Sequence, residues 1–279
     1  MPQYCRADQM KAYGSTEEMA RAIRRSSLQM VHRAKASHIG SALSITDIMA
    51  VLYGQVMHHD PSNPLSQVRD RFILSKGHAC VAVYATLAEV GYITFEDLLT
   101  YGQDFSWLMN HISHKVPGVE FSTGALGHGL PFGVGKALAA KRRADPWTTY
   151  VLLGDGEMDE GSNWEALMFA AHHRLSNLVA VIDCNNLQSL TTVEETLSLE
   201  PLAYKLSSFG CDVAEINGHD HVQLAIELEK RHENKPRAII ARTIKGKGVS
   251  FMENSVDWHY KNPTDDQLNA ALRELDGLK

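Results

Sequence analysis

The chain has 279 residues, of which 44% are hydrophobic and 22% charged, and its net charge is −6 at pH 7. This composition is ordinary for a globular protein, and the length allows a substantial core. A mildly acidic chain without a basic stripe gives no electrostatic case for binding nucleic acid or an anionic membrane. No apolar stretch approaches the length of a membrane span, and the polar N-terminus has no apolar signal core.

The four cysteines, Cys5, Cys80, Cys184 and Cys211, form no C-x-x-C pair. Their spacing therefore favours neither a zinc site nor a redox motif. Because they lie in mostly apolar runs, we expect buried small side chains in a protein of the reducing cytoplasm.

The first half of the chain predicts helices around one short strand. Residues 1–15 are polar and are interpreted as an N-terminal arm. We expect a helix from Ser15, where Ser, Thr and two Glu offer a capped start, and a second helix within residues 41–57. A loop with two prolines at 58–67 precedes a strand at 71–75 and a helix at 78–90, which Gly91 ends.

The second half alternates strands with helices. Residues 101–129, rich in Gly, His, Ser and Thr, are typical of a functional segment, and a helix at 130–143 follows. The alternation of strands and helices predicts an α/β fold with a mostly parallel sheet flanked by helices on both faces, in a single domain over 1–279. The expected strands are 148–156, 177–186, 211–218 and 236–243, and the expected helices are 162–175, 199–209, 221–231 and 264–275.

The sharpest signal lies at the ends of two expected strands. The first ends in Gly154, Asp155, Gly156 and Glu157, where glycines let the backbone turn tightly and approach a ligand. The next strand ends in DCNN, which places Asn185 thirty positions after Asp155. Neighbouring parallel strands would bring both side chains to the sheet edge at which open α/β sheets bind ligands. The helix that starts near residue 162 is expected to direct its positive end there.

One carboxylate and one amide oxygen form a sparse set of hard ligands. Magnesium accepts such a set when phosphate oxygens and water complete its shell, whereas calcium normally takes more protein oxygens. The pair therefore indicates a metal that bridges the protein and a diphosphate. A lone G-D-G would more often be only a turn, and the asparagine only a cap, but the two spaced strand ends favour the site.

Several motifs in fixed order resemble those of transketolases. GDG followed about thirty residues later by NN resembles the thiamine diphosphate signature, and residues 152–188 resemble the pyrophosphate-binding domain of transketolases in particular. The same holds for SHIGSALS, RDRFILSKGHA, PGVEFSTGALGHGLPFGVG, INGHD and ARTIKGKG. The resemblance covers roughly residues 17–265. It implies the thiamine-diphosphate-binding fold, thiamine diphosphate as cofactor, and Mg²⁺, for which Ca²⁺ or Mn²⁺ can substitute.

The resemblance also implies a role for each matched residue. Asp155 and Asn185 would bind the metal through their side chains, and Leu187 through its backbone carbonyl. Gly156 would contact the diphosphate, and His78 would lie near it. The other residues expected around the cofactor are Gly124, Ala125, Leu126, Gly154, Glu157 and His259, and Glu160 would lie at a subunit interface.

His38, His111 and His259 match histidines that line the family's substrate channel and are the expected catalytic residues. Histidine suits this task because it donates or accepts protons near neutral pH. His114 competes with His111 for the family position, and we prefer His111 for its spacing to residues 117–118.

The sequence departs from the family beside two of these histidines. The family usually has Gly-His-Pro there, but this chain has Ile39 and Ile112 in place of the prolines. The change removes two fixed φ angles. It leaves the local loop geometry and the choice of sugar open.

Full-length transketolases continue for two more domains, which carry the glutamate that activates the aminopyrimidine ring. The chain resembles the N-terminal polypeptide of split members of the family. The resemblance implies a C-terminal partner subunit with the pyrimidine-binding domain, an α2β2 assembly, and no activity of the chain alone. The expected reaction transfers a two-carbon ketol unit from a ketose, by default a sugar phosphate, to an aldose.

Three other hypotheses stay open on the sequence. The α subunit of a 2-oxoacid dehydrogenase shares the GDG to NN signature, but not the histidine set. A non-catalytic binding or regulatory subunit could keep the fold, although the retained ligand residues and histidines argue against it. A metal-dependent hydrolase could use Asp155, Glu157 and Asp159 as a carboxylate cluster, but no strong nucleophile accompanies them.

Overall fold

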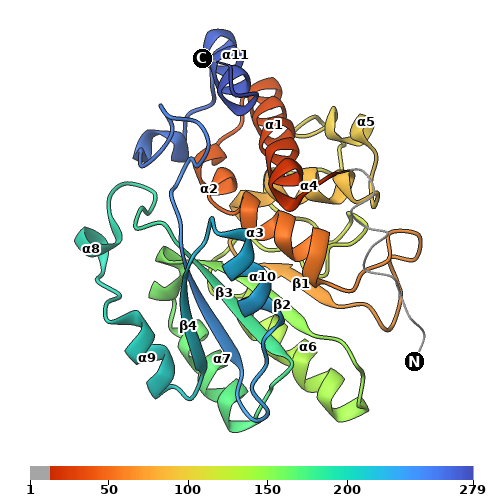
Figure 1. The fold of residues 1–279 in the computed structure, drawn as a ribbon, viewed down its shortest axis with the longest axis vertical. Coiled ribbons are helices and arrows are strands. Elements are labelled where there is room, and N and C mark those ends of the chain that lie inside the picture. The colour runs from red at the N-terminus through yellow and green to blue at the C-terminus, as the bar shows by residue number, and fades with distance from the viewer. Residues whose placement is uncertain (1–12, 279) are drawn as a thin grey trace.

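The computed structural model describes residues 13–278, so nearly all of the expected N-terminal arm lies outside the described residues. The chain begins with helices, and strands and helices alternate from β2 onward (Figure 1). The elements are α1 (Thr16–Ala34), α2 (Ile39–Leu43), α3 (Thr46–Val51), η2 (Leu52–Val56), β1 (Arg71–Leu74), η3 (Gly77–Ala79), α4 (Cys80–Glu89), α5 (Phe95–Leu98), α6 (Gly129–Arg143), β2 (Thr149–Gly154), η4 (Gly156–Asp159), α7 (Gly161–His172), β3 (Leu178–Cys184), α8 (Val193–Thr196), α9 (Leu202–Ser208), β4 (Asp212–Asn217), α10 (His221–Glu229), β5 (Arg237–Arg242), η5 (Val256–His259) and α11 (Asp265–Leu275).

Within residues 13–278 the strands form one parallel sheet in the order β1-β2-β3-β5-β4. The α/β prediction and all five expected strands are confirmed. β2 pairs with β3 so that Gly154 lies opposite Asp183. The segments that follow these two strands therefore leave the sheet side by side at one edge, as the spacing of the GDG and NN motifs predicted.

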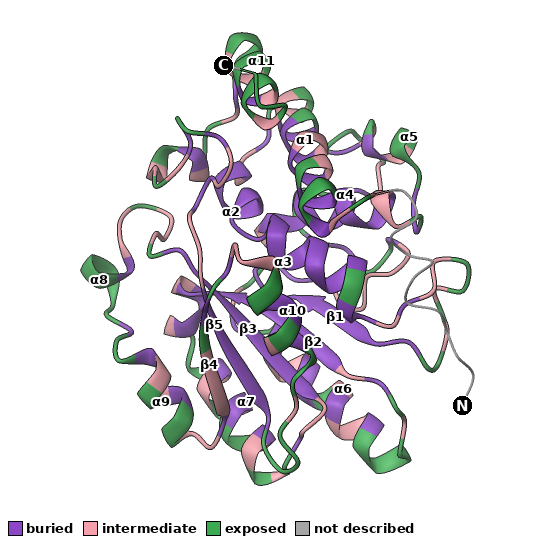
Figure 2. Ribbon diagram, viewed as in Figure 1, coloured by how far each residue is buried: buried purple, intermediate pink, exposed green. Residues whose placement is uncertain are grey.

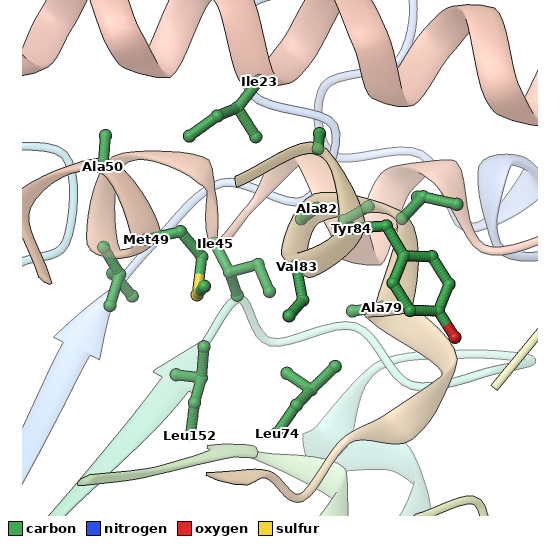
Figure 3. Close-up of a cluster of buried hydrophobic side chains, with 14 of the residues drawn as sticks. Ile23, Ile45, Met49, Ala50, Leu74, Ala79, Ala82, Val83, Tyr84 and Leu152 are labelled. Carbon is green, nitrogen blue, oxygen red and sulfur yellow. The ribbon is translucent and has the colours of Figure 1, made fainter. Parts of the chain in front are cut away.

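Helices cover both faces of the sheet, because alternate strand residues point to opposite sides. One core contains Leu74, Leu152 and Val181 together with residues of α1, α3, α4 and α10. The other contains Val151 and Ile182 together with residues of α6, α7 and α9. The central strands are buried along their whole length (Figure 2). Figure 3 shows the first core, where side chains of α1, α3 and α4 meet those of β1 and β2.

The helix expected within residues 41–57 is present, but it is interrupted. The segment is divided into α2, α3 and the π-helix η2. Ser44 ends α2, and its hydroxyl donates to Ser41 O (3.0 Å) and to the carboxylate of Asp183 (2.7 Å). Thr46 opens α3, and its hydroxyl donates to Leu43 O (2.9 Å). These side chains compete for backbone carbonyls and break the helix where the sequence pattern alone runs on.

Among the described residues, no helix combines the length and the apolar character needed to cross a lipid bilayer. Cys80, Cys184 and Cys211 are buried free thiols, as the sequence predicted for them. Cys5 lies outside the described residues.

Candidate active site

A cavity of about 220 Å³ opens at the carboxyl ends of β1, β2, β3 and β5. It collects residues from segments that are far apart in the sequence. Those predicted from the sequence are His38, His78, His111, Gly124, Leu126, Gly154, Asp155, Gly156, Glu157, Asn185, Leu187 and His259. Those not predicted are Ser41, Lys76, Gln188, Ser189 and Lys245.

Asp155 lies directly after β2 and is only 5% exposed. Its Oδ1 accepts a hydrogen bond from Gly156 N (2.8 Å), and its Oδ2 accepts one from Asn186 N (2.6 Å). Burial and the nearby carboxylate of Asp183 raise the pKa of Asp155 to about 6. A buried carboxylate of this kind is stabilised by a bound cation.

Asn185 is oriented by its neighbours. Its Nδ2 donates to Asp183 Oδ2 (3.0 Å), and its Oδ1 accepts a hydrogen bond from Leu187 N (3.2 Å). Because Asp183 binds the amino side of the amide, the amide oxygen is available to a ligand on the cavity side. The second strand end thus supplies one amide oxygen beside the carboxylate of Asp155.

Asp183 is fully buried at the end of β3 and pairs with Lys76, which is 2% exposed. Lys76 Nζ lies 2.6 Å from Asp183 Oδ2. Burial alone would raise the pKa of Asp183, but Lys76 and the hydroxyls of Thr243 and Ser44 hold it below its usual value. Neither residue was predicted to have a role, although both lie within motifs that resemble those of transketolases.

Glu157 is buried in the cavity wall, and its carboxylate is engaged by donors from three segments of the chain. Its carboxylate accepts hydrogen bonds from the Ser75 hydroxyl, Gly127 N (3.0 Å) and Gly154 N (3.3 Å). We interpret Glu157 as a brace that ties the 124–128 loop to the ends of β1 and β2. Asp159 instead accepts from Gln188 Nε2 (2.9 Å). The carboxylate cluster proposed for a hydrolase is therefore not formed, and residues 13–278 contain no group of three or more His, Cys, Asp or Glu suited to a metal.

The loop at 124–126 borders the cavity on the side of His111. Gly124 and Leu126 line the cavity, whereas Ala125 is exposed and is not part of its wall. A Cβ on Gly124 would lie 3.5 Å from the His111 ring. Glu160 is exposed at the N-terminus of α7 and lies outside the cavity, so its expected interface role stays a prediction.

Four histidines lie together in the wall of the cavity. The ring of His38 lies 5.2 Å from that of His78, 5.9 Å from that of His111 and 5.0 Å from that of His259, between ring centroids. Burial lowers the pKa of His38 to about 4 and that of His259 to about 3, and Lys245 adds to both shifts. Burial also holds the pKa of His78 well below its usual value. These three rings are neutral at physiological pH and can each donate and accept a hydrogen bond.

His111 rather than His114 reaches the cavity. His111 lies in its wall, whereas His114 bonds Ser122 through Nδ1 (2.6 Å). The isoleucines next to the histidines do not line the cavity, since Ile39 is 0% and Ile112 2% exposed. Ile112 N donates to Gly77 O (3.1 Å), a bond that proline could not make.

Lys245, which was not predicted from the sequence, is buried in the cavity wall. It is 1% exposed, and its Nζ lies 3.1 Å from each of Leu187 O, Gln188 O and His259 Nδ1. Burial and the nearby Lys76 lower the pKa of Lys245 to about 8. With Lys76 it gives the cavity two amino groups, which suit an anionic ligand. The signal was present in the ARTIKGKG motif, but a lysine in a loop is usually solvated.

Comparison with known proteins agrees with this geometry. Residues 15–279 match the family model "Transketolase, thiamine diphosphate binding domain". The chain is 44% identical over 251 residues to an apulose-4-phosphate transketolase subunit of Phocaeicola vulgatus, covering 89% of each chain. It is 40% identical to the 6-deoxy-6-sulfo-D-fructose transketolase subunit SqwG of a Clostridium species, covering 93% of this chain and 96% of the relative.

Solved transketolases share the fold. The crystal structure of the Campylobacter jejuni enzyme superposes with a TM-score of 0.89 at 32% identity, covering 95% of this chain but only 43% of that one. This chain therefore corresponds to less than half of a single-chain transketolase. The matches favour this family over the α subunits of 2-oxoacid dehydrogenases. The chain belongs to the transketolase family, and residues 15–279 are its thiamine diphosphate binding domain.

Proposed function

We propose that the chain is the N-terminal, cofactor-anchoring subunit of a two-chain transketolase. The observation that carries this is the cavity itself. It gathers metal ligands, two lysines and four histidines. Among the described residues, the only carboxylates in its wall are Asp155 and Glu157, both already engaged with the protein. We therefore expect the carboxylate that activates the cofactor's aminopyrimidine ring to come from another chain.

The residues present fit a diphosphate with one divalent metal. Asp155, the amide oxygen of Asn185 and the carbonyl of Leu187 are hard oxygen donors, and a diphosphate and water would complete the shell that Mg²⁺ requires. The ammonium groups of Lys76 and Lys245 would attract the remaining diphosphate oxygens, and Gly156, which has no side chain, would let the diphosphate approach the backbone closely. We propose Mg²⁺ as the metal, with Ca²⁺ and Mn²⁺ as substitutes.

The bound cofactor would act as the electron sink for carbon–carbon bond cleavage. The chain's own contribution is to hold the sugar and move its protons. His38, His111 and His259 are proposed to bind substrate hydroxyls at the mouth of the cavity. As neutral rings, His38 and His259 can take up a proton from a hydroxyl and return it to the product. The half-buried His78 would complete the wall between the sugar and the diphosphate.

We further propose a C-terminal partner that carries the pyrimidine-binding domain, in an α2β2 assembly with Glu160 near an interface. Residues 1–279 would form one domain, with 1–15 as an arm, in the reducing cytoplasm that free buried thiols suit. The names of the relatives describe ketoses with an anionic group, a phosphate or a sulfonate. A ketose with a terminal anionic group is accordingly the proposed donor, and an aldose the acceptor.

The test is ketol transfer with the purified chain, with the product of the adjacent gene, and with both together. Thiamine diphosphate, Mg²⁺, xylulose 5-phosphate and ribose 5-phosphate are supplied, and apulose 4-phosphate serves as a second donor. Activity only in the mixture is expected. Robust transfer by the chain alone would refute the need for a partner. A mixture that binds no thiamine diphosphate would refute the catalytic proposal altogether.

A further inference from the structure

A buried carboxylate outside the cavity gathers four donors. Asp47 lies in α3 and is 5% exposed. Its Oδ1 accepts from Arg24 NH1 (3.0 Å), and its Oδ2 accepts from Arg24 NH2 (2.6 Å). His219 Nδ1 lies 2.7 Å from Oδ2 and His221 Nε2 lies 3.1 Å from Oδ1. Capping a short helix requires only one or two hydrogen bonds, so four donors on one carboxylate indicate a further structural role.

Two of these partners continue to the same short segment, residues 243–247. His219 Nε2 accepts a hydrogen bond from Ile244 N (2.8 Å). Arg24 Nε donates to Lys247 O (3.0 Å). The backbone is thus held just before and just after the pair 245–246. These two hydrogen bonds position the backbone of Lys245, whose side chain reaches into the cavity.

The bond to Ile244 also fixes the state of the His219 ring. Because Nε2 accepts from a backbone N–H, it carries no proton, and the ring proton is on Nδ1, facing Asp47. His219 is therefore a neutral bridge with one orientation. Gly246, which has φ +83°, donates its N–H to Gly40 O (3.0 Å), and Lys245 O accepts from Asn254 N (2.9 Å), so the bond from Ile244 N to His219 is what holds the peptide immediately before Lys245.

We propose that Asp47, His219 and Arg24 form a clamp that positions Lys245 for the diphosphate group of the cofactor. The identity of that ligand rests on the proposed function. The clamp residues do not line the cavity, and they act through the backbone of residues 243–247. When the His219 ring is removed, Ile244 N–H loses its acceptor, and Lys245 Nζ leaves its position beside Leu187 O.

His221 offers a matched control for His219. Both rings contact the same carboxylate, and their side chains are similarly buried, with 12% exposed for His219 and 10% for His221. The second nitrogen of His221 bonds the hydroxyl of Thr16 in α1 (2.7 Å) rather than segment 243–247. Replacing either histidine by leucine removes one hydrogen bond to Asp47, but only His219→Leu releases the segment.

The first measurement is labelling of Lys245 by acetic anhydride in the ligand-free chain, followed by mass spectrometry. Lys245 should be labelled several-fold faster in His219→Leu than in His221→Leu or the unmodified chain. His219→Gln, whose amide retains one donor and one acceptor, should restore part of the protection. Equal labelling of the two leucine variants would overturn the clamp. This result needs no bound cofactor and does not depend on the proposed function.

The second measurement is the Kd of thiamine diphosphate with Mg²⁺, by fluorescence titration of the two-chain complex. His219→Leu should weaken binding about tenfold or more, and His221→Leu less than twofold, with similar melting temperatures for both. Equal Kd changes would show a general structural effect and overturn the proposal. If the unmodified complex binds no thiamine diphosphate, the proposed function fails, and the labelling result still decides the clamp.

Discussion

Replacing Lys76 by methionine should destabilise the protein more than almost any other single change near the cavity. Methionine is similar in length but removes the ammonium group from a site in which Lys76 is 2% and Asp183 0% exposed. The carboxylate of Asp183 would keep only neutral donors, from Ser44, Thr243 and Asn185. The remaining charge is then buried without a compensating cation.

The expected loss follows from that burial. Breaking a buried ion pair by removing one partner costs about 3–5 kcal/mol, because the remaining charge is uncompensated. For a chain of this size, roughly 2–4 °C of melting temperature correspond to each kcal/mol, so a fall of roughly 6–20 °C is expected. Adding Asp183→Asn to Lys76→Met removes the uncompensated charge and should recover part of the loss.

Urea unfolding followed by circular dichroism, without cofactor or metal, measures this loss. Lys261→Met is the matched control, because Lys261 pairs with Asp257 (2.6 Å) with more than 60% of each side chain exposed. That exposed pair should contribute less than about 1 kcal/mol. A loss below about 1 kcal/mol for Lys76→Met, or a double variant less stable than Lys76→Met alone, would refute the reasoning.

Three further changes test other features. Gly246→Ala should strongly lower the melting temperature, because Gly246 has φ +83° and a Cβ there would lie 2.2 Å from Met252 O. In the control Gly135→Ala, in α6, the added Cβ meets nothing within 4 Å, so the melting temperature should be unchanged or higher. Burial alone would raise the pKa of Asp47, but its partners hold it well below its usual value, so its stabilisation is present above about pH 4 and is lost as the pH falls further. The unfolding midpoint of Asp47→Asn should therefore lie below that of the unmodified chain at pH 7 and approach it in acid; a constant gap would contradict this. Tyr260 is 56% exposed, and its ring lies 4.8 Å from that of His259. Tyr260→Ala should therefore raise KM for the sugar without changing the Kd of thiamine diphosphate. A changed Kd would contradict the expectation that Tyr260 contacts only the sugar.

The fold could be predicted from sequence because its signals are local. The strands β1, β2, β3 and β5 are short, mostly apolar runs, whereas the edge strand β4 mixes polar and apolar residues. The strand ends at Asp155 and Asn185 follow from the alternation of strands and helices and from the spacing of the two motifs. The break between α2 and α3 was missed because it depends on where the hydroxyls of Ser44 and Thr46 find acceptors. No hydrophobic pattern contains that information.

Site residues could be predicted where a single motif contains them, but contacts between residues of different motifs could not. The pairing of Lys76 with Asp183 joins two motifs that are far apart in sequence, and neither motif alone shows that one charge compensates the other. The same is true of Lys245, which reaches Leu187 O from a different loop. Ala125 was expected beside the cofactor because its motif matched, and the structure places it at the surface, outside the cavity wall.

The backbone hydrogen bond from His38 N to His259 O (2.8 Å) joins the start of α2 to the end of η5 in the wall of the cavity. His38 has φ +74°, an uncommon left-handed conformation for a residue with a side chain, so this contact leaves it little room to adjust. The backbones of the two histidines are therefore coupled, and a substitution that displaces the backbone of either histidine should displace both rings. Sugar preference should therefore evolve through coupled changes near residues 39 and 260, and variants combined across these two positions should show strong non-additivity.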